Sequence, residues 1–315
     1  LMDFVVKMEF RTLSKRLAEK LKVEAPVIAE PTVAVGVSDA PQSAAIDPSK
    51  YETIRDAAGL QVWIDRIYAR GYVAVDTETT GLNEMRADLV GVSLCVEAGE
   101  AAYLPLSHRA GQADDLFGTD ALAEGQMDQA AALVMLKPML EDSTILKIGQ
   151  NMKYDAKILA RVGIQIAPID DTMLMSYAQN GGLHNHGMDF LSERYLDHVP
   201  ISIKTLLGSG KSAITFDRVP IDEASRYAAE DADITLRLWQ YLKPSLHRNK
   251  VTVVYETLER PLVPVLVEME MYGIKVDRDT LSRMSNGFAQ KMAALEAEIH
   301  QMAGRSFNVG SPKQL

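Results

Sequence analysis

The sequence predicts an α/β fold in which a mixed β-sheet is flanked by helices and followed by a helical segment. Strand-like runs come first, at 72–78, 88–97 and 101–108, and short polar connections join them. Helical periodicity dominates from residue 171 onward. Strands followed by helices are typical of a sheet that packs helices against its faces.

The composition narrows the class of protein. A chain of 315 residues, 47% of them hydrophobic, can form one large domain or two ordinary ones. No apolar run approaches the ~18 residues of a membrane span, and the opening LMDFVVKMEF is too short and too charged for a secretory signal. The single cysteine, Cys95, excludes an internal disulfide and fits a reducing cytoplasm, so we expect a cytoplasmic protein without a membrane partner. The chain opens on leucine, and we expect it to be part of a longer protein.

The net charge is −10. It argues against a general nucleic-acid coat, which would normally be basic. It still allows an enzyme that holds a nucleic acid locally through metal ions and a few basic groups.

The N-terminal part of the chain is expected to hold a helix and a linker. Residues 4–22 have the pattern of a basic amphipathic helix, and the stretch 23–50 contains four prolines and no periodicity. A helical stripe then closes before Gly71, and it consists of Leu60, Trp63, Ile64 and Ile67.

The three strands follow, and their short connections predict antiparallel pairing. We then expect a helix around 127–140, a strand at 144–150 and a helix that Asn151 opens as its N-cap. A second boundary is expected near residue 250, with a long helix over 278–303 beyond it.

Two carboxylates stand side by side at the end of the first strand. Asp76 and Glu78 are two residues apart, so their side chains point to the same face of a strand. Two acids at the end of an apolar strand should repel each other and resist desolvation. An Asp-x-Glu pattern alone also occurs in caps and turns.

The second acidic motif is GQNMKYD, which ends at Asp155. Asp155 lies just past the first turn of the expected helix. Taken alone, it is interpreted as a solvent-facing acid favoured by the helix dipole.

The third acidic motif is RYAAEDAD. Its Tyr227 and Asp231 are four residues apart and share one face of a helix. Glu230 and Asp233 fall on other faces and are predicted to be solvated.

The three motifs together supply four carboxylates, which can converge stably if divalent cations neutralise them. Mg²⁺ and Mn²⁺ prefer such oxygen ligands. Two such metals suit phosphodiester hydrolysis, in which one activates a water and the other stabilises the leaving oxygen. His184 and His186 could mimic a zinc pair, but they lie in a glycine-rich loop.

The ordered motifs DTE, N-x-x-Y-D and Y-x-x-x-D resemble those of proofreading 3′–5′ exonucleases of the DEDD type, in the tyrosine-bearing branch. VAVDTETTGL, ILKIGQNMKYD, DDTMLMSY and RYAAEDADITLRL are similar to the exonuclease domain of bacterial family A DNA polymerases, the DNA polymerase I family. RPLVPVLVEMEMYGIKVD and FNVGSPKQL resemble the opening of that family's polymerase domain. MEFRTLSKRL resembles the tail of its 5′-nuclease domain.

The resemblance implies a ribonuclease-H-like fold and three domains. Residues 1–50 would be the 5′-nuclease tail with a linker, 51–250 the exonuclease domain, and 251–315 the first helical part of the polymerase domain. The implied activity is metal-dependent release of nucleoside 5′-monophosphates from DNA 3′ ends, in DNA replication and repair. The implied substrates are single-stranded DNA and the frayed 3′ end of primer-template DNA, in a cytoplasmic, nucleoid-associated setting. Polymerisation is not expected of these residues.

The resemblance also assigns roles to single residues. Asp76 would bridge two divalent metal ions, Mg²⁺ or Mn²⁺, while Glu78 and Asp231 would complete the tighter metal site. Asp155 would hold the second metal through water. Tyr227 would orient the attacking water, helped by Glu78.

Four further positions are implied to lie close to the DNA. Leu82 matches a position that wedges against the terminal base. Gln150, Asn151 and Tyr154 match positions beside the substrate strand.

Two other functions remain open. One is an RNA-trimming exonuclease of the ribonuclease D type, and the other is a catalytically silent domain that only supports a polymerase. Asp170 and Asp171 are interpreted as structural, with Asp171 a helix N-cap. A monomer is expected, and the candidate phosphate contacts are Lys153, Lys204, Lys211 and Arg218.

Overall fold

The computed structural model describes residues 4–5, 8, 10–21, 45–110, 121–210 and 213–314. The chain divides into two compact units, Leu1–Glu268 and Met269–Leu315. None of the helices in the described ranges has the length and apolar character that a membrane crossing needs.

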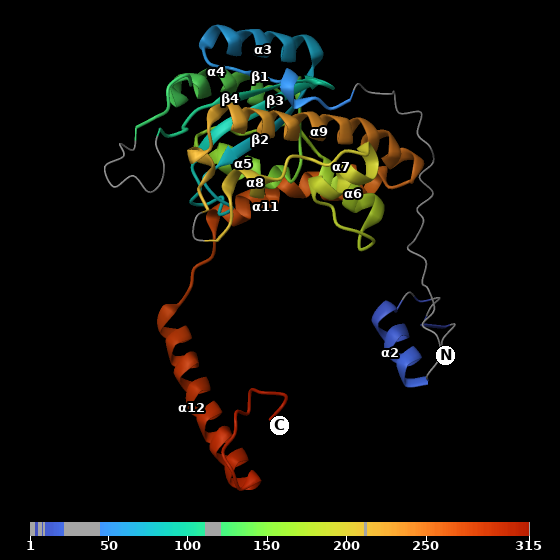
Figure 1. Ribbon diagram of the computed structural model, residues 1–315, viewed down its shortest axis with the longest axis vertical. Helices are drawn as coiled ribbons and strands as arrows, with labels where there is room; N and C mark the ends of the chain where they lie inside the picture. The colour runs from blue at the N-terminus through green and yellow to red at the C-terminus, as the bar shows by residue number, and fades with distance from the viewer. Residues whose placement is uncertain are drawn as a thin grey trace. The chain divides into compact units, whose positions relative to one another are not determined.

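A mixed six-stranded sheet forms the centre of the first unit, as the sequence predicts (Figure 1). The strand order is β1-β4-β3-β2-β5-β6. The pairs β2·β3 and β3·β4 are antiparallel, which confirms the predicted pairing, whereas β1·β4, β2·β5 and β5·β6 are parallel. The strands are β1 (Glu52–Thr53), β2 (Tyr72–Thr79), β3 (Leu89–Glu97), β4 (Glu100–Pro105), β5 (Leu146–Gly149) and β6 (Ile169–Asp171).

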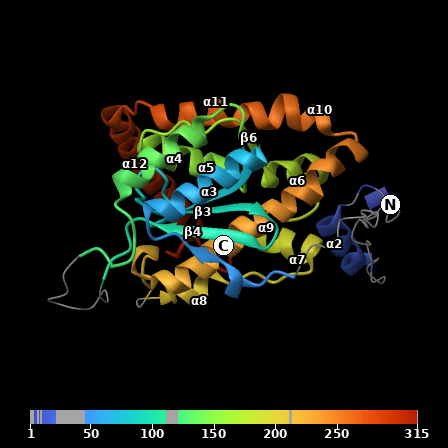
Figure 2. The same ribbon diagram turned by 90° about the horizontal axis from the view of Figure 1, so that it is seen from above.

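Helices cover both faces of this sheet. The helices α3 (Ala57–Arg70), α4 (Gln129–Glu141) and α5 (Met152–Arg161) pack with Val73 and Val75 of β2 in one cluster. Figure 2 shows α3 lying over the strands. The long helix α9 (Ile221–Arg248) packs on the other face, against Ala74, Cys95 and Ile148. Because β2 is central and alternates its side chains between two covered faces, both of its faces are buried.

The remaining elements of the first unit are mostly helical, as expected from residue 171 onward. The predicted N-terminal helix is present in the described residues as α2 (Arg11–Leu21), while the predicted linker lies outside the described residues as far as residue 44. Pro48–Lys50 forms a 3₁₀ turn, η1. The other elements are α6 (Thr172–Asn180), α7 (Met188–Leu196), α8 (Ile203–Leu207), η3 (Phe216–Arg218), α10 (Thr252–Val254), the π-helical η4 (Tyr255–Glu259) and the part of α11 (Arg260–Tyr272) that ends at Glu268.

The second unit contains α12 (Arg278–Ala303), with the bounds that the sequence predicts. The division between the units falls after residue 250, because Tyr255 and Val263 are both buried within the first unit. The domain boundaries inferred from the sequence stay a prediction.

Helix capping agrees with the sequence at α6 and disagrees at α5. Asp171 accepts a hydrogen bond from the backbone N–H of Leu174 and so caps α6 as predicted. Asn151 occupies the N-cap position of α5, but its side chain makes no cap hydrogen bond and its φ is 62°. The predicted capping role of Asn151 is wrong, because the carboxylate of Asp171 on the neighbouring strand accepts the N–H groups there.

We predict opposite effects for two glycine substitutions in and beside α3. Gly71 has φ 79° at the helix C-terminus, so Gly71→Ala should destabilise the first unit by about 1–2 kcal/mol. Gly59 lies within the helix and a Cβ there would make ordinary contacts, so Gly59→Ala should be neutral or stabilising by about 0.5–1 kcal/mol. Urea unfolding followed by fluorescence of Trp63 and Trp239 measures both changes. Equal effects of the two substitutions would contradict this account of the helix end.

Candidate active site

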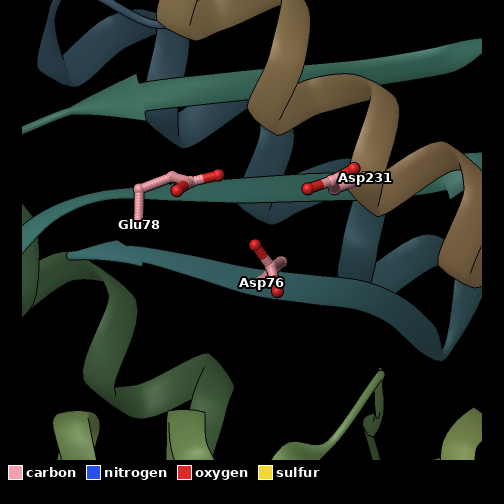
Figure 3. A group of neighbouring side chains, drawn as sticks. All are labelled: Asp76, Glu78 and Asp231. Carbon is pink, nitrogen blue, oxygen red and sulfur yellow. The ribbon is translucent and has the colours of Figure 1, made fainter. Parts of the chain in front are cut away.

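Three carboxylates from two elements meet at one point of the first unit. Asp76 and Glu78 lie on β2 and project toward α9, which supplies Asp231 (Figure 3). One oxygen from each side chain lies within 4.8 Å of the other two. The period of two on β2 brings the first pair to one face, as predicted from the sequence, and the packing of α9 on that face adds the third.

These acids are desolvated. Glu78 and Asp231 are buried and Asp76 is partly buried. Burial raises the pKa of Asp76, and the nearby charge of Asp231 raises it further. Burial also raises the pKa of Glu78, followed by the charges of Asp76, Asp231 and Asp155.

One oxygen of this cluster has no hydrogen-bond donor. The Oε1 atom of Glu78 is buried and makes no hydrogen bond. A buried carboxylate oxygen without a partner is costly unless a cation or a proton satisfies it. Three converging carboxylates with one bare oxygen therefore fit a hard divalent cation.

Asp155 lies at the other edge of this cluster, and the interpretation of it as solvent-facing is wrong. It is 2% exposed. Its Oδ1 accepts hydrogen bonds from the backbone N–H of Thr77 at 3.0 Å and from the Thr77 hydroxyl at 2.6 Å. The first turn of α5 lies against the end of β2, so the carboxylate of Asp155 is bound by Thr77, the residue between Asp76 and Glu78 in sequence, and is not in solvent. Asp155 lies outside the group of three.

Tyr227 and Asp231 share one face of α9, as predicted. Burial raises the pKa of Asp231, and the hydrogen bond from Tyr227 opposes that rise. Burial, followed by the charges of Asp231, Glu78 and Asp76, raises the pKa of Tyr227 above its ordinary value. The phenol therefore keeps its proton at neutral pH.

Glu230 and Asp233 are buried, which contradicts the prediction that they are solvated. Glu230 accepts from His198 Nε2 at 2.9 Å and from the backbone N–H of Ile201 at 2.7 Å. Asp233 accepts from the hydroxyl of Tyr51 at 2.7 Å and also pairs with Arg237. The prediction fails because α9 is covered on several sides, whereas helical periodicity assumes one buried face and one wet face.

The residues implied to contact DNA differ in their exposure and in their hydrogen bonds. Leu82 is 94% exposed in the loop that follows β2. The hydroxyl of Tyr154 donates to the backbone carbonyl of Gly81 at 2.7 Å and so holds that loop. The amide of Gln150 donates to the carbonyl of His186 at 2.8 Å, while Asn151 is exposed.

Tyr103 packs beside the acidic cluster, and the sequence analysis did not identify it. It is fully buried, and a Cβ added to Gly91 would lie 2.2 Å from its hydroxyl oxygen. Gly91 is paired with Glu78 across β2 and β3, so the phenol stands beside that acid. The available signal was a glycine inside an apolar strand, which often marks a close approach of another group.

His108 determines where the Tyr103 proton points. His108 Nδ1 lies 3.0 Å from the carbonyl oxygen of Val219, an acceptor, so Nδ1 carries the hydrogen of the neutral ring. Burial lowers the pKa of His108 and favours this neutral form. Nε2 must then accept, and the Tyr103 hydroxyl, 2.8 Å away, donates to it.

The other candidates have structural contacts. Asp170 is buried among hydrogen-bond donors from α9 and η4, which agrees with its structural interpretation. The hydroxyl of Ser176 contacts His186 Nδ1, and the backbone carbonyl of Asn185 contacts His184 Nδ1. In the part of the chain that the structure describes, neither histidine belongs to a group of three or more possible metal ligands. Lys211 lies outside the described residues, and the phosphate contacts of Lys153, Lys204 and Arg218 stay a prediction.

A model of the 3′–5′ exonuclease family of DNA polymerase A matches residues 51–247. The chain is 52% identical to DNA polymerase I of Rhizobium leguminosarum over 278 residues and 41% identical to DNA polymerase I of Pseudomonas aeruginosa over 289 residues. These alignments cover 85% and 89% of this chain but 27% and 30% of the relatives. The chain thus spans less than a third of their length.

Two solved structures share the fold. The POL domain of Pol1 from M. smegmatis, in complex with DNA primer-template and dNTP, has a TM-score of 0.62 at 21% identity, over 83% of this chain and 39% of that chain. Brucella melitensis NrnC bound to pGG has a TM-score of 0.50 at 23% identity, over 72% of this chain and 95% of that chain. With the family match and the mixed sheet, the predicted ribonuclease-H-like α/β fold is confirmed.

We predict that the protein without metal loses stability as the pH rises. The pKa values of Asp76, Glu78, Asp155 and Asp231 are raised on folding, so above about pH 4 the folded state binds more protons than the unfolded chain. Stability from these groups is therefore present at low pH and is lost as the pH rises through their folded values. Mn²⁺ needs the deprotonated acids and should raise the melting temperature more at pH 8 than at pH 5.

Thermal unfolding in EDTA and in Mn²⁺ at both pH values measures this dependence. Asp76→Asn should stabilise the protein in EDTA at pH 8 by roughly 1–3 kcal/mol, because it removes one of the repelling charges, and it should reduce the effect of Mn²⁺. An equal response to Mn²⁺ at the two pH values would contradict the assignment of these acids as a metal site.

Proposed function

The chain belongs to the 3′–5′ exonuclease family of DNA polymerase A, and from this membership we propose that it is a proofreading exonuclease that releases nucleoside 5′-monophosphates from DNA 3′ ends. The observation that carries the proposal is the meeting of Asp76, Glu78 and Asp231 around a bare Glu78 oxygen. The longer protein of which we propose it to be a part is a DNA polymerase I that acts in DNA replication and repair.

The proposal includes two divalent metal ions, Mg²⁺ or Mn²⁺. Asp76, Glu78 and Asp231 would hold the first, and Asp76 with Asp155 would hold the second, the latter through water. When bound, the two ions supply an activated water and stabilise the leaving oxygen of an in-line displacement at phosphorus.

The remaining roles belong to side chains of the chain itself. The Tyr227 hydroxyl donates a hydrogen bond to Asp231, so the lone pairs of its oxygen can accept a hydrogen bond from the attacking water. Its raised pKa keeps the phenol neutral beside the substrate phosphate. Glu78 would help to orient the same water. Thr77 holds the Asp155 carboxylate through two hydrogen bonds and so limits its rotation.

The proposed substrate is a single-stranded or frayed 3′ end of primer-template DNA. The exposed Leu82 side chain would wedge against the terminal base, with Gln150, Asn151 and Tyr154 beside the strand. The Tyr154 hydroxyl would also keep the Leu82 loop in place through its bond to Gly81. A monomeric, cytoplasmic and nucleoid-associated protein is part of the same proposal.

Two alternatives have less support. The likeness to NrnC at 23% identity concerns the fold and not the ribose or deoxyribose preference. The similarity to DNA polymerase I extends over 85% of this chain, which favours DNA over the RNA-trimming alternative. A silent domain would not need to bury four mutually repelling acids, and all four are present.

We predict that nucleotide release depends on metal and on two side chains. With 3′-labelled single-stranded DNA and Mg²⁺, Asp76→Ala should reduce stepwise mononucleotide release by about 10³-fold or more. Tyr227→Phe should reduce it by about 10²-fold, as expected for one group that orients the nucleophile. EDTA should stop it.

The control is Asp65→Ala on the exposed face of α3, which should leave the rate unchanged. Folding of each variant is checked by thermal unfolding. A folded wild-type protein that releases no nucleotide with either metal would contradict the proposal.

We also predict a preference for deoxyribose ends. Otherwise identical oligonucleotides that differ only in a terminal deoxyribose or ribose are compared by kcat/KM. Faster release of the deoxynucleotide is expected from a proofreading enzyme, whereas faster release of the ribonucleotide would support the ribonuclease D alternative.

A further inference from the structure

A buried polar network extends the exonuclease unit beyond the residues that the family model matches, 51–247. Tyr255, in the π-helical turn η4, is fully buried against β6. Its hydroxyl donates to Asp170 Oδ1 at 2.9 Å and accepts the backbone N–H of Asp171 at 2.8 Å. The hydroxyl is thus a donor to Asp170 and an acceptor from Asp171, two consecutive residues at the end of the edge strand β6.

Asp170 anchors this contact. Its carboxylate is fully buried and also accepts from Trp239 Nε1 at 2.8 Å and pairs with Lys243 at 3.0 Å. Arg260 lies 3.4 Å from Oδ1, and Glu256 pairs with both Lys243 and Arg260. Two acids and two bases balance one another, so β6 is held to α9 and η4 by a network without net charge.

Asp171 connects the end of β6 to the start of α5 through hydrogen bonds. Its carboxylate accepts the N–H of Met152 at 2.8 Å, of Asn151 at 3.3 Å and of Leu174 at 3.1 Å. Asn151 makes no side-chain cap bond, so Asp171 takes the place of the N-cap of α5 while it also caps α6. The position of the first turn of α5 therefore depends on the position of the end of β6.

The first turn of α5 leads directly to the acidic site. Asp155 lies one turn into the helix, and its Oδ1 accepts the N–H and hydroxyl of Thr77. Thr77 stands between Asp76 and Glu78 on β2. An unbroken series of contacts thus runs from Tyr255 through Asp171 and α5 to β2, the strand that carries Asp76 and Glu78.

We propose that Tyr255 is a positioning residue for the acidic site, because its hydroxyl fixes the end of β6 and, through Asp171, the start of α5. The proposal rests on the proposed function, in which Asp155 holds the second metal. It assigns a role in exonuclease action to a residue outside the matched exonuclease segment. Phenylalanine at this position keeps the ring but leaves the buried N–H of Asp171 without its acceptor.

The test uses Tyr255→Phe in the full 315-residue chain, with Tyr241→Phe as the matched control. Tyr241 packs against the same apolar cluster as Tyr255, and the centroid of its ring lies 4.8 Å from that of Tyr195. Both variants lose one hydroxyl and keep one aromatic ring. Only Tyr255→Phe removes a contact to Asp171.

The first measurement is the Mn²⁺ concentration that gives half-maximal thermal stabilisation and half-maximal nucleotide release. We expect it to rise by about 3- to 10-fold in Tyr255→Phe, the size of the net contribution of one typical hydrogen bond, and to stay unchanged in Tyr241→Phe. Saturating Mn²⁺ should restore most of the release rate. A lower melting temperature with an unchanged Mn²⁺ requirement would show a purely structural role and overturn the proposal.

The second measurement does not depend on metal or activity. Amide hydrogen exchange without metal should be faster in Tyr255→Phe than in Tyr241→Phe at residues 151–155 and at Thr77, since these amides lie along the series of contacts. Unchanged exchange there would also overturn the proposal. A wild-type protein that neither binds Mn²⁺ nor releases nucleotides would contradict the proposed function instead, and exchange alone would then decide whether Tyr255 fixes α5.

Discussion

The mutual repulsion of Asp76, Glu78 and Asp231 is the constraint to which the surrounding structure is fitted. Two unit charges about 4 Å apart repel by about 4 kcal/mol at the effective dielectric of a protein near its surface, and burial adds a desolvation cost. The acids are nevertheless held together, because the central strand β2 is fixed by neighbours on both sides and α9 packs across its face. Neither element can move away without exposing a large apolar core. The fold therefore keeps the acids in a state that only a cation or added protons can relieve.

Other buried acids of the first unit show what a structural carboxylate looks like. Asp233 is paired with Arg237, Asp170 with Lys243 and Arg260, and Glu230 with His198 and a backbone amide. Asp171 is surrounded by backbone N–H donors, and burial raises its pKa to about 6. Glu78, by contrast, keeps one buried oxygen without a donor beside two further acids. The buried Oε1 of Glu78, with two further acids beside it and no donor, therefore sets this cluster apart from the paired acids named above.

The helix α9 connects the two polar centres of the unit. Its first half supplies Tyr227 and Asp231 to the acidic site, and its second half supplies Trp239 and Lys243 to the network around Asp170. Because one helix of 28 residues carries both, a displacement at β6 and a displacement at the site cannot be independent. The role proposed for Tyr255 would therefore have a second route to the acids, through Asp170 and α9, beside the one through Asp171 and α5.

The sequence alone determined the α/β class, the central strand, the antiparallel strands, the stripe of α3 and the bounds of α12, since each depends on local periodicity or a local cap. It also indicated Asp76, Glu78 and Asp231, because the DTE and Y-x-x-x-D motifs are local and carry a family resemblance. Only the tertiary structure decided the rest. β1 and β6 are too short to show alternation, and each exists because a longer strand pairs with it. The burial of Glu230 and Asp233, the capping of α5 by Asp171 and the packing of Tyr103 beside the acidic cluster all come from elements distant in sequence. No local pattern encodes such a contact, because it depends on which surfaces the folded chain brings together.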